Sequence, residues 1–411
     1  MITHHVSRPT PRIKELLMHP DRFQHTTAGR LIRAQQADVE YWAFVPNPLP
    51  PELDWSEKRL RLTLSQADHA LGELAGLGHT LPNPHLLIAP FIRREAVLSS
   101  RIEGTRTNLG DLYAYEKGQA PPPGATEPPP AADTQEVANY VHTLEFGLEQ
   151  IARGQPISLW LIRGLHTHLM GGVRGARYRP GEFRAIQNFI GPDNHLHHAK
   201  YIPPPPLHMQ QCLTDLETYI AAAPAEAALV RLAFIHYQFE AIHPFEDGNG
   251  RLGRLLLSLL LVSWDILPLP LLYLSAYFEH YREDYYARLQ AVSERGDWSA
   301  WVIFFLTGVA EQARDAIARA RHLQDLREAW RERLVQIKAP ANTLTLAENL
   351  FLNPFITAPQ AQEFLEVTYR TANATIGRLE EVAIVQQIPE RSHPRQYVAG
   401  EILSILDEAT Q

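Results

Sequence analysis

The residue types best suited to chemistry in this chain are concentrated in one stretch, HPFEDGNGRLGR, which runs from His243 to Arg254. The turn inside it contains Gly248, Asn249 and Gly250. Glycines allow backbone N–H groups to converge without Cβ clashes, and a helix that follows adds its positive N-terminal end. This combination is typical of a phosphate cradle.

Three kinds of charged or titratable side chain in the stretch support the same interpretation. Arg251 and Arg254 are three residues apart, so they lie on one helical face and can fork onto phosphate oxygens. Asp247 supplies a hard carboxylate for Mg²⁺, which usually takes one or two protein carboxylates together with phosphates and water. His243 is the natural general base. The stretch therefore predicts phosphate chemistry with a divalent cation.

Two apolar segments must position this stretch. Residues 229–242 and 255–264 are rich in Leu, Val, Phe and Ile and contain no Pro or Gly, which predicts two buried helices with the stretch between them. A P-loop is excluded because the Lys-Ser/Thr pair is missing. An EF-hand that started at Asp247 would require Gly and Glu where Leu252 and Ser258 stand. A glycine-rich interhelical turn without chemistry is the remaining alternative.

The stretch resembles the signature of the Fic family, H-P-F-x-[DE]-G-N-G-R-x-x-R, and it matches at every defined position. The resemblance implies a mostly helical enzyme that transfers AMP from ATP, with Mg²⁺, to a Ser, Thr or Tyr hydroxyl of a target protein. His243 would deprotonate that hydroxyl, Phe245 would anchor the loop and Asp247 would hold Mg²⁺. The nucleotide contacts that the resemblance implies are Gly248, Asn249 and Gly250 as an anion hole, Arg251 at the β-phosphate, Arg254 at the γ-phosphate and Tyr281 as a candidate base contact.

A second motif lies at the end of a predicted helix over residues 83–102. The sequence Ser99-Ser100-Arg101-Ile102-Glu103-Gly104 places Ser99 and Glu103 one helical turn apart. It resembles the Fic inhibitory motif, [S/T]-x-x-x-E-[G/N]. The resemblance implies that Glu103 pairs with Arg254 and occupies the place of the γ-phosphate. The alternative is a helix end with a solvated glutamate.

Residues 185–203 predict a β-hairpin, because apolar segments flank the turn sequence Gly191-Pro192-Asp193-Asn194. This hairpin resembles the Fic flap, which aligns a target segment by strand pairing. It carries His195, His197 and His198, for which a Zn²⁺ site is conceivable. Solvated histidines are the more usual arrangement on an exposed turn.

Residues 340–411 predict three short helices followed by two paired segments, an order that resembles a winged helix. The third helix would begin at 368–373 and act in recognition, while Arg391, His393 and Arg395 would lie at the tip of the wing. The segment holds 4 Arg, no Lys and 9 Asp+Glu, a balance of −5. Since DNA binding needs phosphate neutralisation, DNA binding and protein docking both stay open.

The whole-chain composition excludes some classes of protein. With 38 Lys+Arg against 46 Asp+Glu, the net charge of −8 gives no general basic footprint for nucleic acid. The single cysteine, Cys212, can form no internal disulfide, which fits a reducing cytoplasm. Residues 255–274 are long enough to span a membrane, but Asp265 and two prolines interrupt them, so we expect a buried helix and no membrane association.

We therefore expect a mainly α-helical chain in three parts. Residues 1–133 would form an N-terminal arm and the inhibitory-helix region, residues 134–338 a Fic core with a helical connector, and residues 340–411 a winged-helix-like domain. The leading function is protein adenylylation inhibited by Glu103. Removal of AMP from a modified protein is the second, with Glu103 positioning a water. A DNA-binding regulator with a nucleotide-sensing core is the third, and a homodimer is left open.

Overall fold

The chain folds as a mainly helical molecule, which confirms the predicted fold class. The computed structural model describes residues 18–36, 39–80, 85–116, 130–172, 179–192, 195–223, 225–388 and 394–407. The helices within these residues are α1 (Lys58–Thr80), α2 (His85–Ile102), α3 (Leu109–Glu116), α4 (Ala131–Ala152), α5 (Leu159–Leu169), α6 (Pro206–Ala221), α7 (Ala228–Ile242), α8 (Asn249–Ser263), α9 (Ser275–His280), α10 (Arg282–Arg295), α11 (Trp298–Gln336), α12 (Ala341–Asn349), α13 (Ala358–Leu365), α14 (Tyr369–Glu381) and α15 (Gly400–Asp407). The strands are β1 (Gly29–Gln36), β2 (Val39–Pro46), β3 (Phe355–Thr357), β4 (Gln386–Gln387) and β5 (Gln396–Val398).

The core is built around α7 and α8, which pack against each other as the two predicted apolar helices. Nearly every residue of both helices is buried, and each large apolar side chain removed from water contributes about 1.5–3 kcal/mol. Helix α8 begins at Asn249, inside the glycine-rich stretch rather than after it, because Gly248 adopts a left-handed conformation and serves as its N-cap. The stretch is therefore held at both ends by buried helices.

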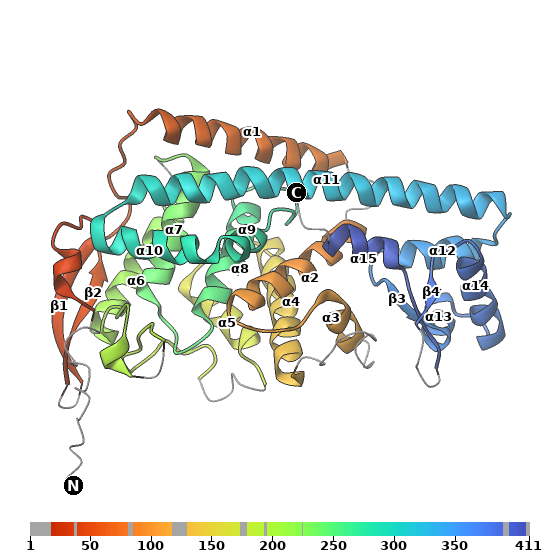
Figure 1. Cartoon of the computed structure of the whole chain (residues 1–411), viewed down its shortest axis with the longest axis horizontal. Helices are drawn as coiled ribbons and strands as arrows, with labels where there is room; N and C mark the ends of the chain where they lie inside the picture. Colours follow the sequence, from red (N-terminus) through yellow and green to blue (C-terminus); the bar gives the residue numbers. More distant parts are fainter. Residues whose placement is uncertain are drawn as a thin grey trace, which may run out of the picture.

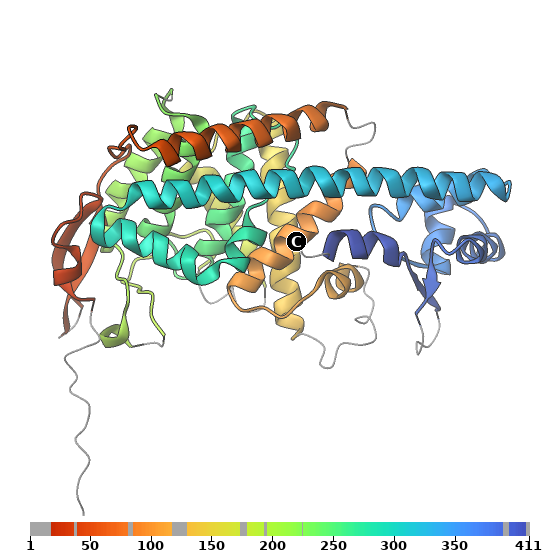
Figure 2. The same ribbon diagram turned by 45° about the horizontal axis from the view of Figure 1, so that its top comes forward.

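One long helix, α11, runs the length of the molecule, with α1 packed alongside it (Figures 1 and 2). Gly308 lies within this helix, where a glycine could weaken it. The structure is continuous there, and the glycine serves packing instead: a Cβ at position 308 would lie 2.6 Å from Cδ1 of Tyr277. At 39 residues, α11 is about 58 Å long at 1.5 Å per residue.

The N-terminal segment contains a strand where the sequence predicted an extended or short-helical arm. β1 pairs antiparallel with β2 from Gly29–Pro46 to Gln36–Val39. β2 buries Tyr41 and Ala43 to Val45, whereas β1 buries none of its described side chains. β1 therefore lacks the alternating pattern that marks a half-buried strand. Residues 1–17 lie outside the described residues.

Within the described part of the segment predicted as a β-hairpin, 185–203, one antiparallel bridge forms, between Ile190 and Tyr201. A short 3-10 turn, Leu196–His198, lies just before the second of the two apolar segments, 199–203. Pro192 and Pro203 cannot donate to a ladder, and the side chain of Gln187 donates instead to the carbonyl of Pro203 at 2.9 Å. Asp193 and Asn194 lie outside the described residues. We call residues 185–203 the flap below.

Beyond α11 the described residues form four short helices, α12 to α15, with a three-stranded sheet in the order β3-β5-β4. Helix α13 begins with a capping box between Thr357 and Gln360. Glu366, Val367 and Thr368 then join α13 to α14, and the two helices pack together. Arg391 and His393 of the predicted wing lie outside the described residues. No described helix combines the length and apolar character that a bilayer crossing needs.

Candidate active site

The loop between α7 and α8 is fixed by its own polar side chains. His243 ends α7 in a left-handed conformation, with φ 49° and ψ 61°. Asn249 at the start of α8 accepts a hydrogen bond from the backbone N–H of Phe245 and donates to its carbonyl, both at 2.9 Å. Asn188 of the flap donates to that carbonyl at 2.8 Å. These hydrogen bonds join the loop to the start of α8 and to the flap.

His166 of α5 also contacts this loop and helps to hold it in place. The sequence analysis did not predict this role. Its ring stacks on Phe245 with centroids 3.7 Å apart. Its Nδ1 accepts from the N–H of Gly181 at 2.9 Å, so Nε2 carries the proton and donates to the carbonyl of Asp247 at 3.0 Å. Burial lowers the pKa of His166 to about 4. The one feature of the sequence that could have indicated this role is the position of His166 among the apolar residues of a helix.

Arg184 ties the flap to the loop. Its guanidinium is buried and donates to the backbone carbonyls of Ile186, Pro204, Ile242 and His243, at 2.5–3.4 Å. Burial lowers its pKa to about 10. Because the guanidinium binds carbonyls of the flap region and carbonyls at the end of α7, it fixes the distance between these two segments.

His243 is neutral at ordinary pH. Burial, and next the positive charge of Arg184, lower the pKa of His243 to about 4. Its Nδ1 is buried and makes no hydrogen bond to the described residues. An imidazole that is unprotonated near pH 7 can accept a proton from an approaching group.

Arg254 lies against the inhibitory motif, as the resemblance implies. Its Nε donates to Oγ of Ser99 at 2.9 Å, and its Nη2 donates to the carbonyl of Ser99 at 2.9 Å and to Oε1 of Glu103 at 2.6 Å. The side chain of Arg254 is 1% exposed and that of Glu103 is 36% exposed. Burial raises the pKa of Glu103, but the charge and hydrogen bond of Arg254 outweigh it, so the pKa of Glu103 lies below its ordinary value.

The end of α2 places Glu103 with little freedom. The N–H of Gly104 donates to the carbonyl of Arg101 and the N–H of Thr105 to that of Ser100, which is the hydrogen-bond pattern of a Schellman motif. Gly104 has φ 98°, a left-handed conformation that disfavours other residues. Glu103 lies so close to Gly250 that a Cβ at that position would collide with its Oε1. Its carboxylate thus covers the N-terminal turn of α8, a natural site for an anion.

Arg251 and Asp247 lie at the same end of α8. Arg251 is 5% exposed and pairs with Glu136 of α4 at 3.1 Å. Asp247 is 45% exposed, and its Oδ1 accepts from the N–H of Gly248 at 2.7 Å and lies 3.9 Å from Nη2 of Arg251. The described residues contain no cluster of three or more His, Cys, Asp or Glu suited to a metal. One accessible carboxylate does fit Mg²⁺ that arrives with a polyphosphate, since this ion keeps several waters.

The aromatic residues after α8 are arranged differently from the expectation. Tyr281 lies between α9 and α10, is 38% exposed and packs against Tyr277 with ring centroids 4.8 Å apart. Burial, and next the negative charge of Glu103, raise the pKa of Tyr286 in α10. The structure thus brings together His243, Asp247 to Gly250, Arg251, Arg254, Ser99 and Glu103, while Tyr281 packs against Tyr277 and His280.

The fold is that of Fic proteins. A solved Fic family protein from Desulfovibrio desulfuricans G20 superposes with a TM-score of 0.54 and 20% identity, covering 85% of this chain and 98% of that chain. A solved fragment of Fic-1 from Caenorhabditis elegans gives a TM-score of 0.50 and 21% identity, covering 64% of this chain and 74% of that one.

Two parts of the sequence match family models. Residues 62–149 match the profile described as Fic/DOC family N-terminal, and residues 156–261 match the Fic/DOC family itself. These residues therefore carry Fic/DOC N-terminal and Fic/DOC domains, which confirms the expected resemblance.

Curated relatives carry a common description. A probable protein adenylyltransferase from Aquifex aeolicus is 37% identical over 65 residues, which is 16% of this chain and 20% of that protein. Protein adenylyltransferase fic-1 from Caenorhabditis briggsae is 30% identical over 171 residues, 40% of this chain and 28% of that protein. The protein adenylyltransferase Fic from Nematostella vectensis is 24% identical over 210 residues, 50% of this chain and 44% of that protein. The matches thus span less than half the length of these relatives.

Proposed function

We propose that the chain is a protein adenylyltransferase that transfers AMP from ATP to a Ser, Thr or Tyr hydroxyl of a target protein. The observation that carries the proposal is the loop between α7 and α8. It holds the neutral base His243 at one end, and at the other the N-terminal turn of α8 with Arg251 and Arg254. The naming of its relatives as protein adenylyltransferases supports this assignment.

In the proposed reaction the target hydroxyl oxygen attacks the α-phosphorus, the bond to the β-phosphate oxygen breaks, and pyrophosphate leaves. His243 accepts the hydroxyl proton. Gly248 to Gly250 present backbone N–H groups to the phosphates, and Arg251 and Arg254 balance their charge. Such positioned charges provide most of the catalysis in phosphoryl-group transfer.

Mg²⁺ would be held by Asp247 together with phosphate oxygens and water, where it would neutralise part of the phosphate charge. The target segment would pair with the flap. Ile186 and Ile190 of the flap are 56% and 42% exposed, and apolar side chains beside an incomplete ladder suit a peptide that adds as a strand.

Glu103 would inhibit this reaction. Its carboxylate holds Arg254 and covers the N-terminal turn of α8, where an anionic phosphate would otherwise lie. ATP would bind with its phosphates displaced, or only after Glu103 moves away.

Incubation with Mg²⁺ and ATP labelled at the α-phosphate tests the proposal. We expect little transfer by the wild-type chain and strong self-modification by Glu103→Ala, which intact-mass spectrometry would register as a discrete AMP step. No transfer by either protein, to itself or to added proteins, would refute it. If wild type instead releases AMP from a protein modified beforehand and Glu103→Ala does not, removal of AMP is the function, with Glu103 positioning the water.

A further inference from the structure

The unit that follows α11 exposes a helix surface that the proposed transfer of AMP does not use. Helix α14 buries only one apolar stripe, Ala372, Thr375, Ile376 and Leu379. Its other residues face solvent and include Tyr369, Arg370, Thr371, Asn373 and Arg378. These are side chains that contact base edges and phosphates: Arg pairs with guanine, Asn with adenine, and Thr and Tyr with phosphate oxygens.

The connection before α14 has the geometry of a helix-turn-helix. Helix α13 (Ala358–Leu365) is followed by three residues and then by α14, and the two helices pack together. Glu366 in the turn is left-handed, with φ 53°. The strands β4 and β5 pair beside this unit, with Gln386 opposite Val398. In such units the second helix lies in the major groove and its N-terminal residues reach the bases.

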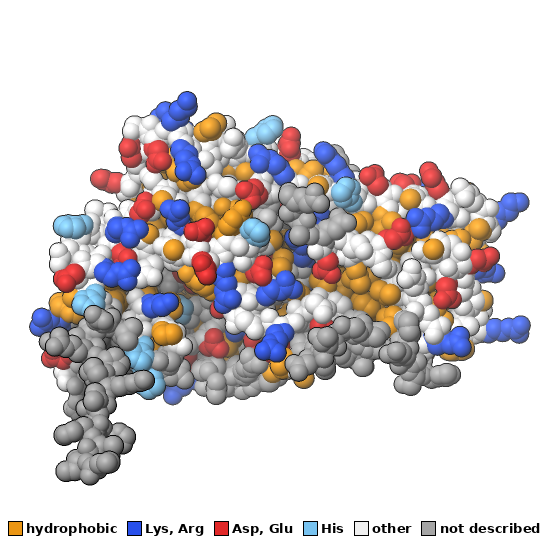
Figure 3. Space-filling model, viewed as in Figure 1, with side chains coloured by type: hydrophobic (Ala, Val, Ile, Leu, Met, Phe, Trp, Pro, Cys, Tyr) orange, Lys and Arg blue, Asp and Glu red, His pale blue; other side chains and the backbone are white. Residues whose placement is uncertain are grey.

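Charge is distributed unevenly over this unit. Its net charge of −5 therefore does not describe the surface of α14. Of the four arginines in 340–411, Arg370 and Arg378 are exposed on α14, and Arg395 is exposed next to β5. Residues 369–379 contain no acid, whereas Glu363 and Glu366 lie before α14 and Glu380 and Glu381 at its end. Lys and Arg side chains project, together with acidic ones, at the end of the molecule where α14 lies (Figure 3).

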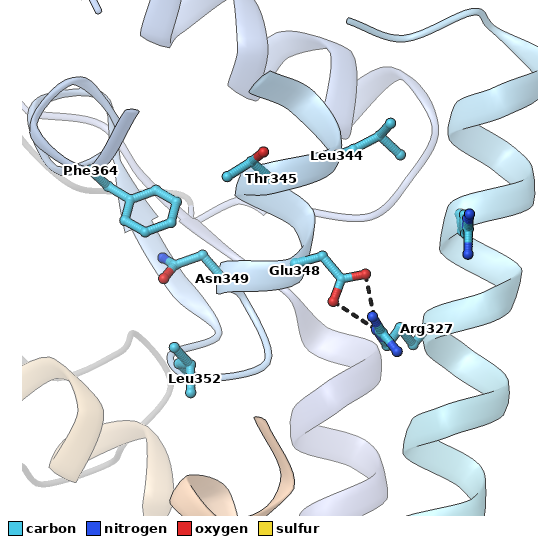
Figure 4. Close-up of a pocket in the computed structure, with 8 residues that line it drawn as sticks. Arg327, Leu344, Thr345, Glu348, Asn349, Leu352 and Phe364 are labelled. Atoms are coloured by element: carbon cyan, nitrogen blue, oxygen red, sulfur yellow. Dashed lines mark hydrogen bonds and ion pairs between the residues drawn. The ribbon is translucent and has the colours of Figure 1, made fainter. Parts of the chain in front are cut away.

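Two of the acids, Glu348 and Glu401, pair with arginines of α11. Both carboxylate oxygens of Glu348 accept from Nε of Arg327, at 2.7 and 2.9 Å, beside a pocket of about 570 Å³ between α11 and α12 (Figure 4). Glu401 accepts from Arg333 at 3.1 Å and from the indole of Trp330 at 2.8 Å. The composition of 340–411 therefore overstates the negative charge that a ligand on α14 would meet.

We propose that this unit binds double-stranded DNA, with the N-terminal half of α14 in the major groove and Arg370, Arg378 and Arg395 at the phosphates. The proposal is independent of AMP transfer, because its test contains no nucleotide triphosphate. Three phosphate contacts predict that the logarithm of the affinity falls with the logarithm of salt concentration with a slope of about −2.7.

The test uses the full chain and a fluorescein-labelled mixed-sequence duplex of about 30 base pairs, long enough for one such unit and its flanks. Fluorescence anisotropy should show binding at low salt that weakens with the stated slope. Arg370→Ala and Arg378→Ala should each weaken binding by about tenfold and reduce the slope by about 0.9. Arg153→Ala is the matched control, since that arginine is 63% exposed on the core and should leave affinity unchanged. Thermal melting establishes that the variants fold.

Three outcomes would overturn the proposal. The first is no binding of the duplex by wild type at any salt concentration, which would favour docking of a protein on α14. The second is equal binding by wild type and the two α14 variants, which would place the DNA elsewhere. The third is tighter binding of a single strand of the same length than of the duplex, which a helix in the major groove cannot explain.

Discussion

Replacing Glu103 by alanine tests the ion pair at the centre of the site. Arg254 is held by Ser99 as well as by Glu103, so its guanidinium should keep its direction when the carboxylate is removed. ATP would then find a free and oriented arginine at the N-terminal turn of α8. In the wild-type chain ATP must first displace Glu103 from it.

The magnitude follows from the contact. A hydrogen bond between charged groups contributes about 1.5–3 kcal/mol. Glu103 is 36% exposed, so solvent screening places its contribution at the lower end of that range. A competing interaction of about 1.5 kcal/mol reduces affinity by about tenfold. We therefore expect Glu103→Ala to bind Mg²⁺-ATP about tenfold more tightly, with only a small change in melting temperature.

Isothermal titration calorimetry measures the affinity, and intact mass measures self-modification. The control is Glu149→Ala, since Glu149 is an exposed glutamate paired with Arg153 on α4 that should leave both unchanged. Adding Arg254→Ala to Glu103→Ala should cancel the gain. If Glu103→Ala binds ATP as wild type does and gains no AMP, the carboxylate does not compete with the nucleotide and the reasoning fails.

Three further predictions concern the loop. In the Glu103→Ala background, where strong transfer is expected, His243→Ala should reduce transfer by ~10²–10⁴-fold and leave ATP affinity intact. Because the pKa of His243 is about 4, the kcat/KM of Glu103→Ala should not fall near pH 6.5 on acidification, and a midpoint there would contradict this pKa. Arg251→Ala should weaken ATP binding by roughly 1.5–3 kcal/mol and Asp247→Ala should remove its Mg²⁺ dependence, both measured by calorimetry; unchanged binding in both would rule out the anion site. His166 is neutral in the folded protein, where its pKa is about 4, but it takes up a proton on unfolding below about pH 6.5. The wild-type protein should therefore lose stability as the pH falls from 6.5 towards 4, and the melting temperature of His166→Gln should fall less steeply. Identical slopes for the two proteins would exclude this coupling.

The signature loop could be predicted from sequence because its chemistry is local. Gly248, Asn249 and Gly250 follow one another, and Arg251 and Arg254 share one face of a helix whose apolar residues are evident. The pairing of Glu103 with Arg254 is different, because 151 positions separate them. No periodicity connects two such residues, and only the family resemblance suggested their contact.

The residues that support the loop were not predicted, for physical reasons. Arg184 binds carbonyl groups, which every residue possesses, so its partners leave no mark in the sequence. His166 acts through ring stacking and one tautomer, neither of which a residue pattern encodes. β1 was missed because its side chains stay partly exposed. The flap was predicted with too much β-structure, since its turn residues were recognised but the competition of Gln187 for the carbonyl of Pro203 was not.

Helix α11 has a consequence for how this protein can be divided or recombined. The predicted boundary near residue 339 follows the end of α11, yet Trp330 and Leu334, each 1% exposed, are buried near that end, and the indole of Trp330 packs against Phe351 of the following unit. A protein divided there would expose the apolar end of α11 on the core to water. The C-terminal unit would lose the side chains of α11 that pack against its own apolar residues. A chimera that takes its C-terminal unit from a relative must therefore take the second half of α11 from the same relative. The segment that must be transferred as one piece therefore includes the end of α11 as well as the short helices and strands that follow it.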